Sequence, residues 1–186
     1  PKMFIAENVK GILSANKRKA FPLILNEFED AGYYVAYEIL NSAFYGVPQK
    51  RERVIIVGIH KSFSRLFNFA LPPISDLKDA TPLKAVIESE VDEKYYFSQR
   101  AVDGMMRNRK LMNKGRAQNI HVPCNTVGAH LAKVSLNSTD PVLLVNDRYR
   151  RFTPREVARI QSFPDDFRLV GSESAQYRAL GNAIPP

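Results

Sequence analysis

The sequence predicts an α/β protein: part of a doubly wound sheet, followed by a second, smaller domain of irregular structure. Two observations support this fold class. Residues 1–60 alternate short apolar runs with a segment of helical periodicity, the pattern of strands and helices that share a sheet. In residues 61–150, prolines interrupt short segments that keep no helical period. Helical signals return over residues 151–186, so we expect three divisions with these boundaries.

Three strands and one helix are predicted at the start of the chain. The apolar run 4–6 ends at the polar segment 7–9, as in a parallel strand that carries functional groups at its C-terminal end. Apolar residues then recur at helical spacing over 21–32 and stop at a glycine, which suits the position after a helix. Residues 33–40 are rich in Tyr, Val and Ile, which favours a strand. Residues 53–59 are continuously apolar, as expected of a strand covered on both faces.

The middle of the chain carries a cluster of basic side chains. Its members are Arg107, Arg109, Lys110, Lys114 and Arg116. Interleaved methionines and a leucine are compatible with an amphipathic helix that has one basic face. These side chains are therefore candidates for contact with an anionic partner, although a cluster of this kind is also typical of a solvated helix face.

A strong helix start occurs at Thr153-Pro154-Arg155-Glu156. The Thr153 hydroxyl can cap the helix, Pro154 suits its first position, and Glu156 can complete a capping box. We expect this helix to end at Pro164.

The composition excludes several classes of protein. A chain of 186 residues with 45% hydrophobic content can form a real core. No apolar run approaches the roughly 18 residues that a membrane span needs, and no export signal begins the chain, which predicts a cytoplasmic setting. One cysteine and three scattered histidines form neither a disulfide framework nor a zinc site, so we expect no metal.

The charge balance favours a polyanionic partner. Lys and Arg number 27 against 19 Asp and Glu, which gives a net charge of +8 and a sequence pI near 9.6. Nucleic acid is the natural candidate for such a surface. Charge alone does not separate this interpretation from an ordinary solvated basic surface.

Two short segments could recognise a nucleobase. Glu7 follows the first predicted strand, and a carboxyl group can donate a hydrogen bond to a ring nitrogen or accept one from an exocyclic amine. Arg51 and Arg53 alternate with Glu52, so their guanidinium groups would lie on one side of an extended backbone and suit a phosphate and a carbonyl oxygen. The alternatives are a capping or surface acid at Glu7 and a salt-bridged strand start at Arg51 to Arg53.

Taken together and in order, four segments resemble the later half of the DNA (cytosine-5)-methyltransferase family. They are Glu7-Asn8-Val9, Gln49-Lys50-Arg51-Glu52-Arg53, Arg151-Phe152-Thr153-Pro154-Arg155-Glu156 and Gly181-Asn182-Ala183-Ile184-Pro185-Pro186. The resemblance runs the length of the chain. It implies part of the doubly wound, Rossmann-like sheet of a methyltransferase that uses S-adenosylmethionine.

The resemblance also implies roles for individual residues. Glu7 would hold a flipped cytosine at its N3, while Arg51 and Arg53 would contact the O2 of the base and support the active-site loop. Asn182 and Ala183 belong to a segment that folds back beside the cofactor in this family.

Residues 61–150 correspond to the target recognition domain of the family, and duplex DNA is the expected partner. The basic cluster and Gln49 are expected to contact DNA. Asn125 and Thr126 belong to a segment that resembles a short Thr-Val or Thr-Leu element of this domain, which makes them candidates for base or backbone contacts.

Two features of the family are missing. Its nucleophile is the cysteine of a Pro-Cys motif that precedes the Glu-Asn-Val motif, whereas Cys124 follows both catalytic motifs and is expected to be structural. No segment resembles the Phe-x-Gly-x-Gly loop of the cofactor site, so the S-adenosylmethionine site should be incomplete.

We therefore expect the C-terminal portion of a restriction-modification methyltransferase, inactive until an N-terminal half in the same or a separate chain is added. The portion could be a truncated chain or the second polypeptide of a split enzyme. The alternative from another class is a non-catalytic DNA-binding or specificity subunit. An unrelated nucleotide-binding enzyme would need a phosphate-binding glycine loop, which the sequence lacks.

Overall fold

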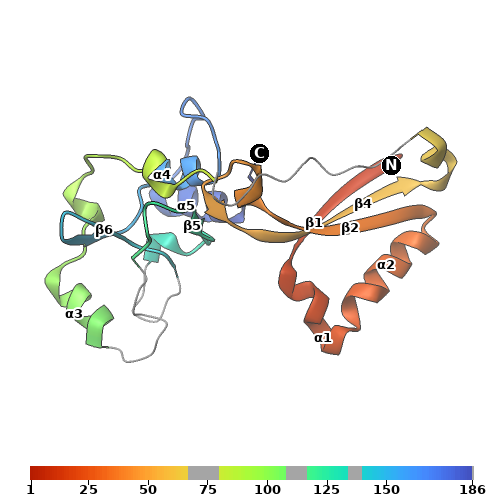
Figure 1. The fold of residues 1–186 in the computed structure, drawn as a ribbon, viewed down its shortest axis with the longest axis horizontal. Coiled ribbons are helices and arrows are strands. Elements are labelled where there is room, and N and C mark those ends of the chain that lie inside the picture. The colour runs from red at the N-terminus through yellow and green to blue at the C-terminus, as the bar shows by residue number, and fades with distance from the viewer. Residues whose placement is uncertain (67–79, 108–116, 134–139, 186) are drawn as a thin grey trace. The chain divides into compact units, whose positions relative to one another are not determined.

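A computed structural model describes residues 1–66, 80–107, 117–133 and 140–185 (Figure 1). The chain forms two compact units. The first consists of Pro1–Asn41 and Arg51–Ile74, and the second of Ser42–Lys50 and Ser75–Pro186. The units differ from the predicted divisions, because the short segment before Arg51 and the whole of residues 151–186 belong to the second unit.

The first unit contains a three-stranded sheet in the order β1-β4-β2. The strands are β1 (Met3–Val9), β2 (Tyr33–Asn41) and the central strand β4 (Glu52–His60). Each outer strand pairs with β4 in the antiparallel direction. The three strands of this sheet therefore do not show the parallel pairing expected from the apolar runs, because an apolar run records burial and carries no information about strand direction.

One face of this sheet is covered by the helix α2 (Ala20–Asp30), as Figure 1 shows. Phe21 of the helix packs with Val54 and Ile56 of the central strand. A short turn, α1 (Ala15–Arg18), precedes the helix. Gly32 follows it with a φ of +93°, the left-handed conformation that glycine adopts without strain. The predicted helix and its glycine stop are confirmed.

The opposite face of the sheet exposes apolar side chains. Ile5 and Val9 of β1 are 66% and 52% exposed, and Tyr34 of β2 is 59% exposed. The alternation of side chains along β1 places Ile5, Glu7 and Val9 on this face. Glu7 therefore lies within the strand, whereas the sequence placed it just beyond the strand end.

The second unit contains short strands and helices. Its strands are β3 (Gln49–Lys50), β5 (Cys124–Asn125), β6 (Leu143–Val145) and β7 (Arg148–Arg150), and its α-helices are α3 (Gln99–Arg107), α4 (Pro154–Ile160) and α5 (Glu173–Asn182). Strands β3 and β5 pair in parallel, and β6 and β7 pair antiparallel. Single 3₁₀ turns occupy Lys10–Ser14 and Lys61–Leu66 in the first unit, and Ser42–Tyr45, Leu83–Ala85, Glu93–Tyr95 and Leu131–Lys133 in the second.

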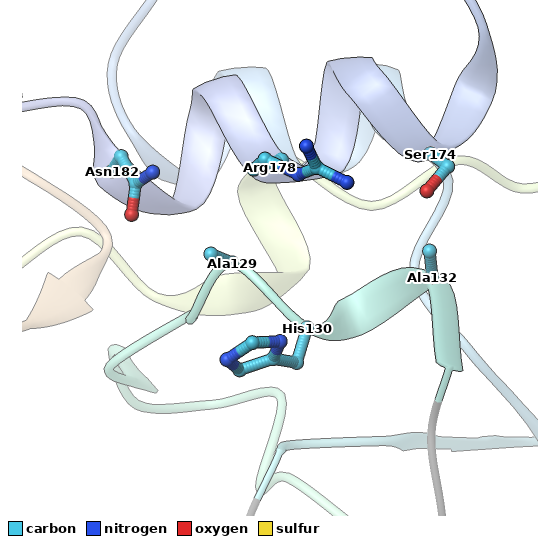
Figure 2. Close-up of a pocket in the computed structure, with 6 residues that line it drawn as sticks. All are labelled: Ala129, His130, Ala132, Ser174, Arg178 and Asn182. Carbon is cyan, nitrogen blue, oxygen red and sulfur yellow. The ribbon is translucent and has the colours of Figure 1, made fainter.

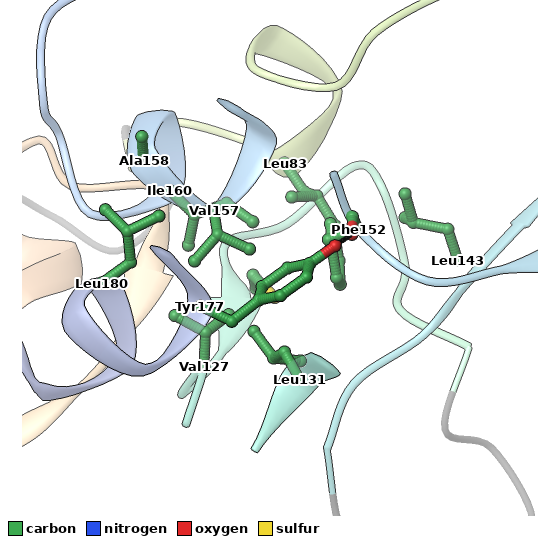
Figure 3. Packing of buried hydrophobic residues seen from close by; sticks show 11 residues of the cluster. Leu83, Val127, Leu131, Leu143, Phe152, Val157, Ala158, Ile160, Tyr177 and Leu180 are labelled. Atoms are coloured by element: carbon green, nitrogen blue, oxygen red, sulfur yellow. Dashed lines mark hydrogen bonds between the residues drawn. The ribbon is translucent and has the colours of Figure 1, made fainter. Parts of the chain in front are cut away.

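The core of the second unit forms around α4 and α5 (Figure 3). Its buried side chains include Leu83, Val127, Leu131, Leu143, Phe152, Val157, Ile160, Tyr177 and Leu180. The Tyr177 hydroxyl donates a hydrogen bond of 2.5 Å to the carbonyl oxygen of Phe152, so the one polar atom of this aromatic side chain is satisfied inside the core.

The start of α4 confirms the predicted capping box. The Thr153 hydroxyl accepts the backbone N–H of Glu156 at 3.1 Å, and the Glu156 carboxylate accepts the backbone N–H of Thr153 at 2.8 Å. The same carboxylate receives both terminal nitrogens of Arg150, each at 2.7 Å, and both side chains of this ion pair are buried. Glu156 therefore fixes the strand β7 against the helix α4.

We predict that Glu156→Ala destabilises the chain by about 3–5 kcal/mol, because it leaves the Arg150 guanidinium buried without its carboxylate. Urea unfolding measures this loss. Glu93→Ala is the matched control, since it removes the carboxylate that pairs with Arg148 at the exposed surface, and it should leave the midpoint nearly unchanged. Equal midpoints for the two variants would contradict the structural role of the buried pair.

Candidate functional site

An ion pair joins the first and second sequence motifs within the sheet. Glu7 of β1 and Arg53 of β4 are diagonal neighbours, because Glu7 pairs with Ile55 and Val9 pairs with Arg53. Arg53 Nε lies 2.7 Å from Glu7 Oε1, and the two side chains are 17% and 19% exposed. The contact lacks the angles of a hydrogen bond, and Glu7 Oε1 accepts none from the described residues. This oxygen is buried beside the guanidinium of Arg53, which balances its charge.

Arg51 adds a second guanidinium to this cluster. It is 5% exposed, and its pKa is lowered first by the loss of hydration on burial and then by the positive charge of Arg53. The negative charge of Glu7 acts in the opposite direction. An arginine stays charged in spite of such a shift. The three side chains therefore form one electrostatic group of two cations and one anion.

Glu52, which separates the two arginines in the sequence, turns away from this group. Its carboxylate pairs with Lys10 at 2.9 Å in an exposed contact. The acidic partner of Arg53 is thus Glu7 from the neighbouring strand. The sequence also allowed a salt-bridged strand start at Arg51 to Arg53, and Arg53 does form a salt bridge, but with an acid of the first motif.

Gln49 is fully buried and acts as a structural link. Its Oε1 accepts the backbone N–H of Val127 at 2.8 Å, and its Nε2 donates to Gln161 Oε1 at 2.9 Å. Gln161 Nε2 in turn donates to the carbonyl oxygen of Leu180 at 2.7 Å. Because the amide is buried and engaged at both ends, the geometry does not support the DNA contact predicted for Gln49 and gives it a positioning role instead.

Asn125 and Thr126 lie beside this link, at the surface. Asn125 pairs with Lys50 in the parallel ladder of β3 and β5, and its side chain is exposed. The Thr126 hydroxyl donates to the carbonyl oxygen of Lys50 at 2.8 Å. The ladder and this bond hold the predicted contact segment against the second motif.

Most of the predicted basic cluster lies outside the described residues: Arg109, Lys110, Lys114 and Arg116. Arg107 is the last residue of α3. The DNA contacts expected of this cluster remain predictions.

Asn182 and Ala183 lie at the C-terminal end of α5. Asn182 is the last residue of the helix and is exposed, and Ala183 follows as its cap. The preceding Gly181 lies against the backbone of Gly128 and Ala129, where an added Cβ would stand 2.3 Å from the carbonyl carbon of Gly128. Only a residue without a side chain permits this approach, which explains the glycine of the last motif.

The structure adds two residues that sequence reasoning did not single out. Arg178 and His130 line a groove together with Asn182 (Figure 2). The helical spacing of Ser174, Arg178 and Asn182 places all three on one side of α5, and this spacing is visible in the sequence. Nothing in the sequence indicates that His130 faces them.

Cys124 has the environment of a structural thiol. It is fully buried in β5, and burial raises its pKa to about 12. A nucleophilic cysteine needs a lowered pKa, so the geometry supports the structural role expected from its position in the sequence.

Within the described ranges, no group of three potential metal ligands occurs, and no helix is long and apolar enough to span a membrane.

Solved structures define the class of fold. The S. pombe Dnmt2 methyltransferase matches with a TM-score of 0.72 at 19% identity, over 100% of this chain and 61% of that chain. The Entamoeba histolytica methyltransferase EhMeth matches with a TM-score of 0.71 at 20% identity, over 100% and 59%. The predicted α/β methyltransferase fold is confirmed.

The family follows from sequence. A model of the family described as C-5 cytosine-specific DNA methylase matches residues 1–186. Type II methyltransferase M1.ScrFI of Lactococcus lactis subsp. cremoris is 34% identical over 99% of this chain and 48% of its own length. Type II methyltransferase M.MthTI of Methanothermobacter thermautotrophicus is 36% identical over 100% and 62%. The chain therefore belongs to the C-5 cytosine-specific DNA methylases, a family of enzymes, and spans about half the length of these relatives.

We predict that Cys124 resists iodoacetamide at about pH 8 in the folded chain, because only roughly one thiol in ten thousand is ionised four pH units below its pKa. The same reagent should modify Cys124 fully in urea. Mass spectrometry after timed quenching follows both reactions. Rapid, stoichiometric modification of the folded chain would contradict the buried environment of the thiol.

Proposed function

We propose that this chain is the base-holding and DNA-contacting portion of a DNA (cytosine-5)-methyltransferase of the restriction-modification type. The complete enzyme transfers the methyl group of S-adenosylmethionine to carbon 5 of a cytosine flipped out of duplex DNA. The observation that supports this proposal best is the cluster of Glu7, Arg51 and Arg53, in which two motifs distant in sequence meet on one sheet.

The cluster suits the pairing edge of cytosine. The Glu7 side chain is 19% exposed, and its carboxyl group can bind N3 and the exocyclic amine of the base. The guanidinium groups of Arg51 and Arg53 supply donors for the O2 carbonyl. Their positive charge also stabilises negative charge that develops on the ring when a nucleophile adds to carbon 6.

The cofactor site belongs only in part to this chain. Asn182 is exposed at the end of α5, and its amide makes no hydrogen bond to the described residues, so Asn182 and Ala183 can form one edge of an S-adenosylmethionine site. Bound S-adenosylmethionine would supply the methyl group, and loss of the carbon 5 proton together with the nucleophile on carbon 6 would restore the base. These two residues help to close the site, and the glycine loop comes from elsewhere.

The N-terminal half of the enzyme is the proposed partner, in the same or a separate chain. The exposed apolar face of the sheet, with Ile5, Val9 and Tyr34, has the character of a surface that another part of the protein covers. Glu7 and Arg53 lie on this face, so the half that docks there would meet the base-holding cluster. The burial of Cys124 supports a nucleophile that is supplied by that half.

We predict that the chain alone transfers no methyl group from labelled S-adenosylmethionine to duplex DNA. Fusion behind the upstream half of a relative such as M1.ScrFI should produce 5-methylcytosine, detected by nucleoside mass spectrometry. In the fusion protein, Glu7→Gln should lower kcat/KM by about 100-fold or more, because an amide cannot supply the proton that the carboxyl group holds at N3.

Glu38→Gln is the matched control for this substitution. Glu7 and Glu38 both pair with Ile55 of the central strand, one from each side, so Glu38 lies on the same face of the sheet. The loss of its charge should leave the rate unchanged. Methyl transfer by the chain alone would refute the division of the enzyme into two halves. Equal activity of the two glutamine variants would refute the role of Glu7.

A further inference from the structure

A groove of about 480 Å³ lies in the second unit, between α5 and the segment 129–132 (Figure 2). Ser174, Arg178 and Asn182 line it from the helix, and Ala129, His130 and Ala132 line it from the segment. Four of these six residues carry polar side chains. The groove is therefore a polar surface feature that is separate from the cluster of Glu7 and the two arginines.

The close approach of two glycines holds the walls of the groove together. Gly181 of α5 contacts the backbone at Gly128, and a Cβ at position 181 would also stand 2.4 Å from the backbone nitrogen of Ala129. The helix is anchored on its other side by the bond from Gln161 to the carbonyl oxygen of Leu180. The backbone just before His130 is consequently held against α5, and His130 lines the same groove as Arg178.

The charge in the groove has no counterpart among the described residues. Arg178 is exposed and forms neither an ion pair nor a hydrogen bond there. The nearest acidic residue on α5, Glu173, is already engaged by Arg151 and Lys94. Five described arginines of the unit do have a partner: Arg148 and Glu93, Arg150 and Glu156, Arg151 and Glu173, Arg159 and Asp165, and Arg155 and the carbonyl oxygen of Phe167.

Two other polar side chains of the groove, Ser174 and His130, can also donate hydrogen bonds. The Ser174 hydroxyl and the His130 imidazole each offer an N–H or O–H, and neither has a partner among the described residues. A guanidinium accompanied by further hydrogen-bond donors is an arrangement that binds the oxygens of a phosphate group. No acidic side chain lines the groove to oppose such a ligand.

We propose that this groove binds one backbone phosphate of duplex DNA, with Arg178 supplying the charge and His130 and Ser174 supplying hydrogen bonds. This inference rests on the proposed function, since it names the phosphate contact of a chain that binds DNA. The segment that carries His130 begins three residues after Thr126, a predicted base contact. A phosphate fixed at His130 and Arg178 would therefore set the register in which Asn125 and Thr126 meet the bases.

The salt dependence of duplex binding tests the charge. Each phosphate neutralised by a cation contributes about 0.9 to the slope of log K against log salt concentration. Arg178→Ala should lower the slope by about 1 between about 50 and 200 mM salt, measured by fluorescence anisotropy. The loss should be the same for duplexes of different sequence, because a phosphate contact does not read bases.

Arg168→Ala is the matched control. Arg168 is also an exposed arginine of the second unit that has no ion pair or hydrogen bond to the described part of the chain, but it lines a mainly apolar hollow with Phe163, Phe167 and Leu169. Its removal should leave the slope unchanged. If Arg178→Ala and Arg168→Ala give the same slope as the unmodified chain, the proposed phosphate contact is refuted.

A second measurement separates this proposal from the proposed function. The chain has three histidines, His60, His121 and His130, so the imidazole resonances in a carbon-proton NMR spectrum provide two internal controls. Inorganic phosphate and a short duplex are titrated separately, and His130→Asn assigns the third signal. Phosphate and duplex should each shift the His130 signal and leave the other two in place, and Arg178→Ala should abolish both shifts.

The outcomes distinguish the possible failures. If the duplex does not bind but phosphate shifts His130 in an Arg178-dependent way, the phosphate site stands and the DNA-binding function fails. If the duplex binds with a normal slope while neither ligand shifts His130, the function stands and the phosphate site is refuted. If neither ligand shifts His130 and no duplex binds, both are refuted.

Discussion

The buried contact between the side-chain amides of Gln49 and Gln161 is the interaction on which the second unit depends. It connects four segments that are far apart in sequence, because one amide also binds the backbone at Val127 and the other binds the carbonyl oxygen of Leu180. Each buried amide would lose about 1–3 kcal/mol without its partner, so the four segments must assemble together. The second sequence motif thus meets, in the core, the end of the helix that begins in the third motif and the residue just before the fourth.

Two functional surfaces follow from this arrangement. Gln49 holds β3 beside β5, which presents Asn125 and Thr126 at the surface. The bond to Leu180 holds α5 in place, and the glycine contact at Gly181 then forms the groove that carries Arg178 and His130. The cluster of Glu7, Arg51 and Arg53 in the first unit, for which we propose a base-holding role, has a simpler origin, since it needs only the register of β1 and β4.

Local signals in the sequence predicted local structure. The capping box at Thr153 and Glu156 and the glycine after α2 were readable because each depends on neighbouring residues. Strand direction was not readable, since apolar periodicity is the same in parallel and antiparallel pairs. The burial of Gln49 and the meeting of His130 and Arg178 in one groove were also hidden, because the residues concerned lie on segments distant in sequence. The family resemblance identified the motif at Gln49 but not the direction of its side chain.

The most direct test of the amide link is a double-mutant cycle of Gln49→Ala and Gln161→Ala, measured as the free energy of urea unfolding. Each single variant should lose about 1–3 kcal/mol, because it leaves a buried amide unsatisfied. The double variant should lose at least about 1 kcal/mol less than the sum of the single losses, since residues in one hydrogen-bond network are coupled. Losses that add to within about 0.5 kcal/mol would show that the two amides act independently and would contradict the central role of their contact.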